Sequence, residues 1–245
     1  MLRKALASLP KTLDDTYARI LCSIDEVHRE NALKILRWLA YSARPLQIEE
    51  VAEVIAVNIE DHPQFDPERR FPEPRDILTI CSSLVTVGAT EGSRDRVTRE
   101  QIRLAHFSVK EYLVSERIRA GPASQYSIQE IHTNVSIAEI CLAYLLQFDN
   151  PTSLTFRTFE EFPLARYAAR YWTQHARVAR KDMSATHLLI MELFLSKRDA
   201  YANWIRLFDP DRPERELDIT ESLEKDMKSI PSPLYYASLV GLIES

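Results

Sequence analysis

His106 is the side chain in this sequence whose position best suits chemistry, because it stands where a strand gives way to a helix. Strand-forming residues alternate over Ile102–His106, whereas the apolar residues of 109–113 follow the i, i+3, i+4 spacing of a helix face. Ser108 is placed to cap the first turn of that helix. The imidazole therefore faces whatever lies beside the helix start. A histidine satisfied by its own local backbone is the alternative interpretation.

Patterns that would support catalysis do not occur in the sequence. Glycine is found only at positions 88, 92, 121 and 241, whereas a phosphate-cradling loop or a strained nucleophile turn needs glycines within a few residues of one another. The six histidines show neither HExxH nor paired-ligand spacing. We therefore expect a non-enzymatic chain with no catalytic residue, no metal site and no cofactor of its own. Any nucleotide must then be bound by something outside this chain.

Composition indicates a folded protein of a reducing compartment. The chain has 245 residues, 45% of them hydrophobic, and a formal net charge of -5, so it can bury a sizeable core. Its longest mainly apolar run, His187–Leu195, contains Glu192 and is shorter than a membrane span. Cys22, Cys81 and Cys141 are far apart and sit in apolar helical patterns, which predicts buried free thiols. We expect a cytoplasmic protein without a membrane partner.

Residues 1–120 are predicted to form a winged-helix domain. Helices are expected over 13–24 with Thr12 as the cap, 32–41, 48–56 and 75–83, and strands over 84–87 and 102–106. The order helix, helix, helix, strand, turn, strand is typical of that fold. Four prolines in 62–74 predict a mobile loop, and 88–100 reads as a polar turn.

Residues 121–208 show helical periodicity alone, so the fold class is mainly α: a winged helix followed by an all-α helical bundle or solenoid. Ser127 and Glu130 have the spacing of a capping box. The many Tyr and Trp residues between Tyr167 and Trp204 favour either a core or a packing surface for another domain.

The end of the chain is predicted to be a charged linker, 209–230, followed by the start of an ankyrin repeat in 231–245. The sequence Ser232-Pro233-Leu234-Tyr235-Tyr236-Ala237 is similar to the Thr-Pro-Leu-His-x-Ala signature that opens the first helix of such a repeat. It departs from the signature at Ser232 and Tyr235. A single repeat cannot bury its apolar face alone, so we expect the chain to be part of a longer protein.

Taken together, these segments resemble the region after the nucleotide-binding domain in fungal NACHT/ankyrin proteins, which are signal-transduction ATPases with numerous domains (STAND). The resemblance covers nearly the whole chain. It rests on Leu9-Pro10-x-Thr12-Leu13-Asp14-x-Thr16-Tyr17, Ile35-Leu36-Arg37-Trp38-Leu39-Ala40, Arg44-Pro45-Leu46, Cys81-Ser82-Ser83-Leu84-Val85, Leu104-Ala105-His106-Phe107-Ser108-Val109-Lys110-Glu111-Tyr112-Leu113 and Leu164-Ala165-x-Tyr167-Ala168-Ala169-x-Tyr171-Trp172. The winged-helix segment also goes by a name linked to inositol deacylases, but no deacylase serine motif is found here.

The resemblance implies a regulatory protein of signal transduction and innate immunity. The winged helix would close over ADP or ATP held by the upstream NACHT domain, and the helical region would lead to an ankyrin array that binds protein partners. His106 matches the winged-helix histidine that contacts the terminal phosphate of ADP in related switch proteins. Its partners would therefore be the NACHT domain and the ankyrin repeats of the same polypeptide.

A winged-helix module that binds nucleic acid is the main alternative, and a structural protein-protein scaffold is another. Arg94, Arg96, Arg99 and Arg103 of the expected wing are possible phosphate contacts. Against this alternative, residues 1–120 contain 18 Lys and Arg and 19 Asp and Glu, and the helix that would enter the groove, 75–83, is largely apolar. Both observations therefore weigh against nucleic acid as a partner.

Overall fold

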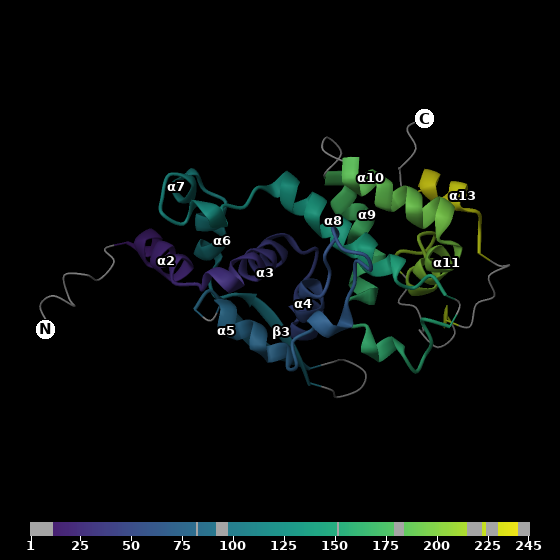
Figure 1. Cartoon of the computed structure of the whole chain (residues 1–245), viewed down its shortest axis with the longest axis horizontal. Coiled ribbons are helices and arrows are strands. Elements are labelled where there is room, and N and C mark those ends of the chain that lie inside the picture. Colours follow the sequence, from purple (N-terminus) through teal and green to yellow (C-terminus); the bar gives the residue numbers. More distant parts are fainter. Residues whose placement is uncertain are drawn as a thin grey trace, which may run out of the picture. The chain divides into compact units, whose positions relative to one another are not determined.

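The computed structural model describes residues 12–81, 83–91, 98–150, 152–178, 184–214, 222–223 and 230–239 (Figure 1). It is mainly helical with a small sheet, as predicted. The chain divides into two compact units, the first formed by residues 1–48 and 71–130 and the second by 49–70 and 131–245. The boundaries expected at 120, 208 and 230 stay predictions. The structure adds that segment 49–70 belongs to the second unit.

Two helices open the first unit. Helix α2 (Leu13–Cys22) begins after Thr12, whose hydroxyl accepts a hydrogen bond from the Asp15 N–H over 3.1 Å, so the predicted cap is confirmed. The short 3₁₀ turn η1 (Glu26–His28) leads into α3 (Arg29–Tyr41). The apolar face of α3 is buried through Ala32, Ile35, Leu36, Trp38 and Ala40.

The sheet of this unit has three antiparallel strands in the order β1-β3-β2. They are β1 (Leu46–Gln47), β2 (Val85–Glu91) and β3 (Thr98–Leu104), and Figure 1 shows β3 beside α3. Strand β1 was not predicted. The expectation of a polar turn over 88–100 was wrong at both ends, because the β2–β3 pairing continues out to Glu91 and Thr98. An antiparallel ladder needs only one buried face, so polar residues extend it without penalty.

Helices α4 (Ile48–Ile55) and α5 (Ile77–Cys81) lie between β1 and β2 in the chain, so the element order of a winged helix is complete. The turn η3 (Pro74–Asp76) precedes α5, which is shorter than the segment 75–83 that we expected. After β3 come α6 (Phe107–Leu113), α7 (Glu116–Arg119) and the turn η4 (Ser124–Tyr126). The predicted capping box at Ser127 is wrong, because α8 begins only at Glu130.

The second unit contains further helices and turns after α7 among the described residues. They are α8 (Glu130–Leu146), the turn η5 (Phe159–Glu161), α9 (Ala165–Val178), α10 (Ser184–Met191), the π-helical turn η6 (Glu192–Ser196), α11 (Arg198–Leu207) and α13 (Pro233–Leu239). Proline is favoured at the first position of a helix, since the missing N–H needs no partner there. This explains why α13 starts at Pro233.

Aromatic side chains form the core of the second unit. Tyr167, Trp172 and Trp204 are fully buried. The indole of Trp204 lies 5.6 Å from that of Trp172, centroid to centroid, and its N–H donates to the Ala169 carbonyl over 2.9 Å. The alternative in which these residues present a surface to another domain is therefore wrong, because the unit uses them for its own packing.

The loop after α4 is held by several contacts, against our expectation of a mobile segment. Val57 pairs with Phe65 in an isolated antiparallel bridge, and the turn η2 (Pro67–Arg69) is capped by the Asp66 carboxylate. Arg70 then anchors the end of the loop, as described below. Prolines here restrict the unfolded chain rather than loosen the folded one.

The structure also shows the environment of the three cysteines and the lengths of the helices. Cys81 and Cys141 are buried as predicted, whereas Cys22 at the end of α2 is exposed, so the expectation was wrong for that residue. All three are free thiols. Within the part of the chain that the structure describes, every helix is too short or too polar to cross a bilayer.

Candidate functional site

His106 stands between β3 and α6 with an extended backbone, as the sequence indicated. It occupies the N-cap position of α6, and its Nδ1 accepts a hydrogen bond from the Ser108 N–H over 3.3 Å. The capping role predicted for Ser108 was therefore wrong, because the helix starts one residue earlier, at Phe107. An imidazole nitrogen replaces the usual side-chain oxygen at this cap.

The hydroxyl of Ser108 links the histidine to α2. Ser108 Oγ lies 2.7 Å from His106 Nδ1 and 2.7 Å from the hydroxyl of Tyr17, which is 91 positions away in the sequence. Tyr17 is largely buried, and its ring packs 5.8 Å from that of Tyr112 on α6. The ring of His106 is thus tied to the core of the first unit through one nitrogen.

The other nitrogen of His106 is available for a ligand. The residue is exposed, and Nε2 makes no hydrogen bond to any residue that the structure describes. Next to it, the Phe107 side chain is 69% exposed with its ring 4.2 Å from the imidazole. Nδ1 thus has the local partner that one interpretation predicted. Contact of Nε2 with a ligand, the other interpretation, stays a prediction.

The predicted wing arginines do not all lie near His106 within the part of the chain that the structure describes. Arg94 and Arg96 lie outside the described residues. Arg99 and Arg103 are on β3, four residues apart and thus on the same face of the sheet. At about 3.3 Å per residue, Arg99 is roughly 20 Å from His106 along the chain. Arg99 is therefore remote from the histidine, whereas Arg103 is only three residues from it in the chain.

Helix α5, which would be the recognition helix of a DNA-binding winged helix, faces inward. Ile77, Ile80 and Cys81 are buried. Arg75, in the turn before the helix, forms an ion pair with Glu100 of β3. These contacts leave little of α5 to read a groove.

A buried polar triad lies in the second unit. His175 Nδ1 is 2.7 Å from Asn134 Oδ1, and its Nε2 is 2.9 Å from the Tyr167 hydroxyl. The amide oxygen can only accept, so Nδ1 carries the hydrogen and Nε2 accepts from Tyr167. Burial lowers the pKa of His175 to about 4. The residue is therefore a neutral core histidine.

A second buried cluster, Glu53–Arg70–Tyr144, was missed by sequence reasoning. Glu53 on α4 is 4% exposed and receives the Tyr144 hydroxyl of α8 and the Arg70 guanidinium, whose Nη2 is 3.1 Å from Oε2. Desolvation raises the pKa of Glu53, and the two hydrogen bonds oppose this rise. No local spacing could have revealed a cluster whose members lie up to 91 positions apart.

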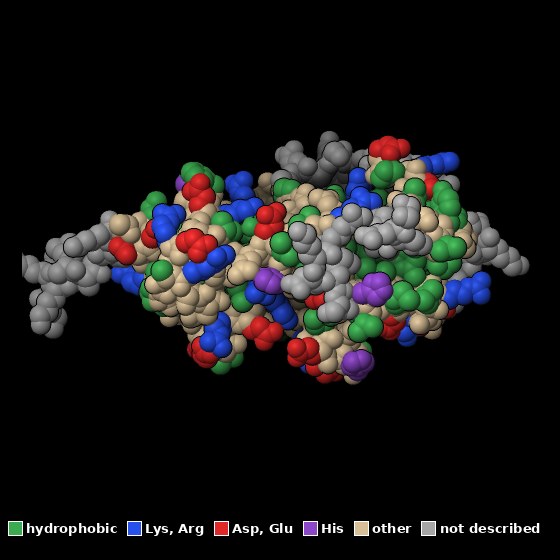
Figure 2. Space-filling model, turned by 90° about the horizontal axis from the view of Figure 1, so that it is seen from above, with side chains coloured by type: hydrophobic (Ala, Val, Ile, Leu, Met, Phe, Trp, Pro, Cys, Tyr) green, Lys and Arg blue, Asp and Glu red, His purple; other side chains and the backbone are tan. Residues whose placement is uncertain are grey.

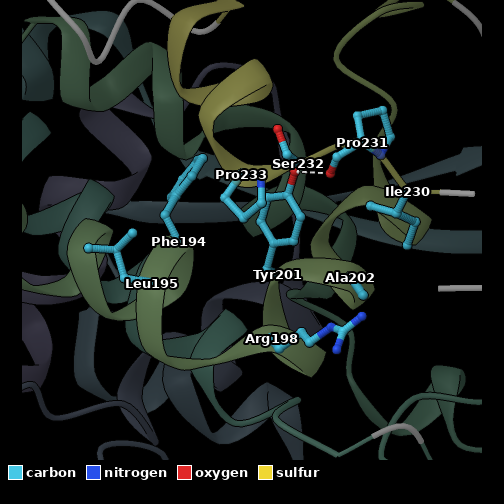
Figure 3. A pocket seen from close by; sticks show the side chains of 9 residues that line it. All are labelled: Phe194, Leu195, Arg198, Tyr201, Ala202, Ile230, Pro231, Ser232 and Pro233. Carbon is cyan, nitrogen blue, oxygen red and sulfur yellow. Dashed lines mark hydrogen bonds between the residues drawn. The ribbon is translucent and has the colours of Figure 1, made fainter. Parts of the chain in front are cut away.

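The described residues of the second unit also enclose a pocket of about 330 Å³ between η6, α11 and the start of α13 (Figure 3). Its walls are mostly apolar, with Arg198 as a cation at the rim. The Tyr201 hydroxyl is already used, since it donates to the Pro231 carbonyl over 2.9 Å. This lining offers packing volume rather than a reacting group.

An apolar surface adjoins the pocket. Figure 2 shows hydrophobic side chains gathered over α10 and α13. The large exposed side chains of this surface are Leu188, Met191, Leu195, Leu234, Tyr235 and Leu239, with exposures between 42% and 71%. Exposed apolar side chains gathered in this way are typical of surfaces that bind proteins, membranes or ligands. We call it the α10–α13 face.

Comparisons with known proteins agree with the fold of the first part. A family model described as the winged helix domain of GPI inositol-deacylase matches residues 17–129. The azaphilone pigments biosynthesis cluster protein L of the fungus Monascus ruber is 40% identical over 238 residues, which cover 97% of this chain and 50% of that protein. The chain thus spans about half the length of this relative. No solved structure matches the chain. The element order, the β1-β3-β2 sheet and the family match together identify residues 17–129 as a winged-helix domain.

Proposed function

We propose that this chain is a non-enzymatic regulatory segment of a NACHT-type switch protein of the cytoplasm. It couples the nucleotide state of an upstream ATPase domain to a downstream array of ankyrin repeats. The observation that carries the proposal is the exposed Nε2 of His106, held at the edge of a winged helix by an otherwise satisfied ring. The match of residues 17–129 to a winged-helix family supports the domain context.

The proposed contact joins His106 to the terminal phosphate of ADP in the upstream domain. Phosphate oxygens are strong acceptors, and a donor that is already oriented loses little entropy when it binds one. Phe107, exposed beside the imidazole, would be covered when the two domains dock. The closed state would then depend on the phosphate that His106 contacts.

The proposed output lies at the other end of the chain. Helix α13 begins at Pro233 as the first helix of an ankyrin repeat does, and Leu234 and Leu239 are exposed on it. These side chains support a stack of further helices on the α10–α13 face. The fungal relative, named for a pigment biosynthesis cluster, is about twice as long as this chain and so has room for such additional domains.

The experiment is ADP release from the full-length protein that contains this chain. His106→Ala should speed the release of a fluorescent ADP about tenfold or more, since a hydrogen bond to a charged group contributes roughly 1.5–3 kcal/mol. His28→Ala, which removes an exposed histidine of the turn η1, is the matched control and should leave release unchanged. Equal release rates for His106→Ala and the parent protein would refute the nucleotide role and favour a structural scaffold.

A winged helix that binds duplex DNA is the second candidate, and the shared face of Arg99 and Arg103 favours it. The buried side of α5 and the Arg75–Glu100 ion pair weigh against it. Gel mobility of a duplex at low and moderate salt decides the matter, because phosphate contacts make binding strongly salt-dependent. We expect no salt-dependent shift; a clear one would establish this candidate.

A further inference from the structure

The hydrogen bonds around His106 determine which of its nitrogens carries the proton. The Ser108 N–H donates to Nδ1 over 3.3 Å, so Nδ1 must present its lone pair. The Ser108 hydroxyl, 2.7 Å away, can then donate to the same lone pair and accept from the Tyr17 hydroxyl. The three groups form one directed chain from Tyr17 through Ser108 to His106.

A neutral imidazole has a single N–H, so a ring that accepts at Nδ1 carries its hydrogen on Nε2. With a hydrogen on Nδ1 instead, the ring would donate to Ser108 Oγ, and the Ser108 N–H would lose the acceptor that Nδ1 provides. The outward nitrogen of His106 is thus a donor, which is the role that a contact to a phosphate oxygen requires. A ring with the opposite tautomer would offer a lone pair there and repel the oxygen.

The anchor of this chain lies in the core. Tyr17 is 9% exposed and packs on Tyr112, so the position of its hydroxyl is set by helix packing rather than by solvent. His106 itself is exposed and would otherwise exchange between tautomers and rotamers. Pre-organisation of an exposed donor through buried neighbours is a common requirement of binding sites.

We propose that Tyr17 and Ser108 are positioning residues that hold His106 in the Nε2–H tautomer and so present a donor to the nucleotide phosphate. The tautomer follows from this chain alone, whereas its use rests on the proposed function. Neither Tyr17 nor Ser108 needs to touch the nucleotide.

Nitrogen NMR of the ring in this chain tests the tautomer directly, at a pH where histidine rings are neutral. In the unmodified chain, the pyridine-type signal should belong to Nδ1 and the pyrrole-type signal to Nε2. Ser108→Ala should lower the ratio of the Nε2–H to the Nδ1–H tautomer by roughly two- to tenfold, the range that one neutral hydrogen bond controls. Tyr17→Phe keeps the packed ring and should act in the same direction with a smaller effect.

The matched control is Ser115→Ala, which removes a hydroxyl of the same unit that donates to the Tyr112 carbonyl over 2.9 Å. It should leave the His106 signals unchanged. A dominant Nδ1–H tautomer in the unmodified chain would overturn the inference. So would an unchanged ratio in Ser108→Ala whose circular dichroism shows a native fold.

ADP release from the full-length protein separates this inference from the proposed function. Ser108→Ala should speed release in the parent protein but add nothing to His106→Ala, because both changes act through one ring. Faster release in His106→Ala without a tautomer change in Ser108→Ala would overturn the positioning role alone. A tautomer change with unaltered release in both variants would overturn the nucleotide role, and the positioning role with it.

Discussion

Replacing Arg70 by methionine should destabilise the protein strongly, because it leaves a buried carboxylate without its cation. The Glu53 side chain is 5% exposed. Arg70 pairs with both of its oxygens and also donates to the Glu161 carbonyl over 2.7 Å. After the substitution, the Tyr144 hydroxyl is the remaining hydrogen-bond partner of Glu53 among the described residues.

The expected loss is about 3 kcal/mol, at the lower end of the roughly 3–5 kcal/mol measured when one partner of a buried ion pair is removed. The lower end applies because the Arg70 side chain is 31% exposed, so water partly screens the pair. In a Glu53→Gln background the same substitution should cost only about 1 kcal/mol, since no buried charge is then left behind. The coupling between the two sites is therefore about 2 kcal/mol.

Urea denaturation, followed by circular dichroism and tryptophan fluorescence, measures these differences. Arg69→Met is the matched control: its side chain is 44% exposed and pairs with Asp61 and Asp66 at the surface, so it should cost less than about 1 kcal/mol. Equal losses for the Arg69 and Arg70 variants, or a coupling near zero, would refute the reasoning.

The pH dependence of the free energy of unfolding tests the direction of this electrostatic effect. Burial raises the pKa of Glu53, and the hydrogen bond from Arg70 lowers it, so loss of Arg70 raises the pKa further. A carboxyl group whose folded pKa exceeds its unfolded value destabilises the fold above the folded pKa and contributes nothing once both states are protonated. The loss of unfolding free energy caused by Arg70→Met should therefore be larger at neutral pH than in mild acid. The opposite trend would contradict this account.

Two further predictions concern buried groups. Because burial lowers the pKa of His175 to about 4, the unfolded chain binds that proton first. Stability should fall as the pH drops from about 6.5 towards 4, by up to ~1.4 kcal/mol per pH unit, and urea titrations of His175→Gln should lack this component. For the thiols, native alkylation followed by mass spectrometry should label the exposed Cys22, whereas Cys81, whose pKa burial raises to about 12, and Cys141 should react only after unfolding; native labelling of Cys141 would show that the core is not closed.

Local features of the fold could be predicted from the sequence with good accuracy. The Thr12 cap, the order of helices and strands of the winged helix, and the strand-to-helix junction at His106 all follow from spacing within a few residues. Two of the errors are also local: the cap at Ser108 and the capping box at Ser127 used suitable residues at the wrong register. Capping preferences are shared by several neighbouring polar residues, and packing selects among them.

The amino-acid sequence by itself determined the mainly helical class, the winged-helix order and the choice of His106 as a candidate site residue. Helix capping and apolar periodicity act over one or two turns, so they can be read from the sequence. Only the tertiary structure decided what His106 can do. The Ser108 hydroxyl beside its Nδ1 also contacts the hydroxyl of Tyr17, which lies 91 positions from Ser108. The Glu53–Tyr144 contact spans the same separation. Such partners are chosen by the way the helices pack, and no spacing along the chain records that choice.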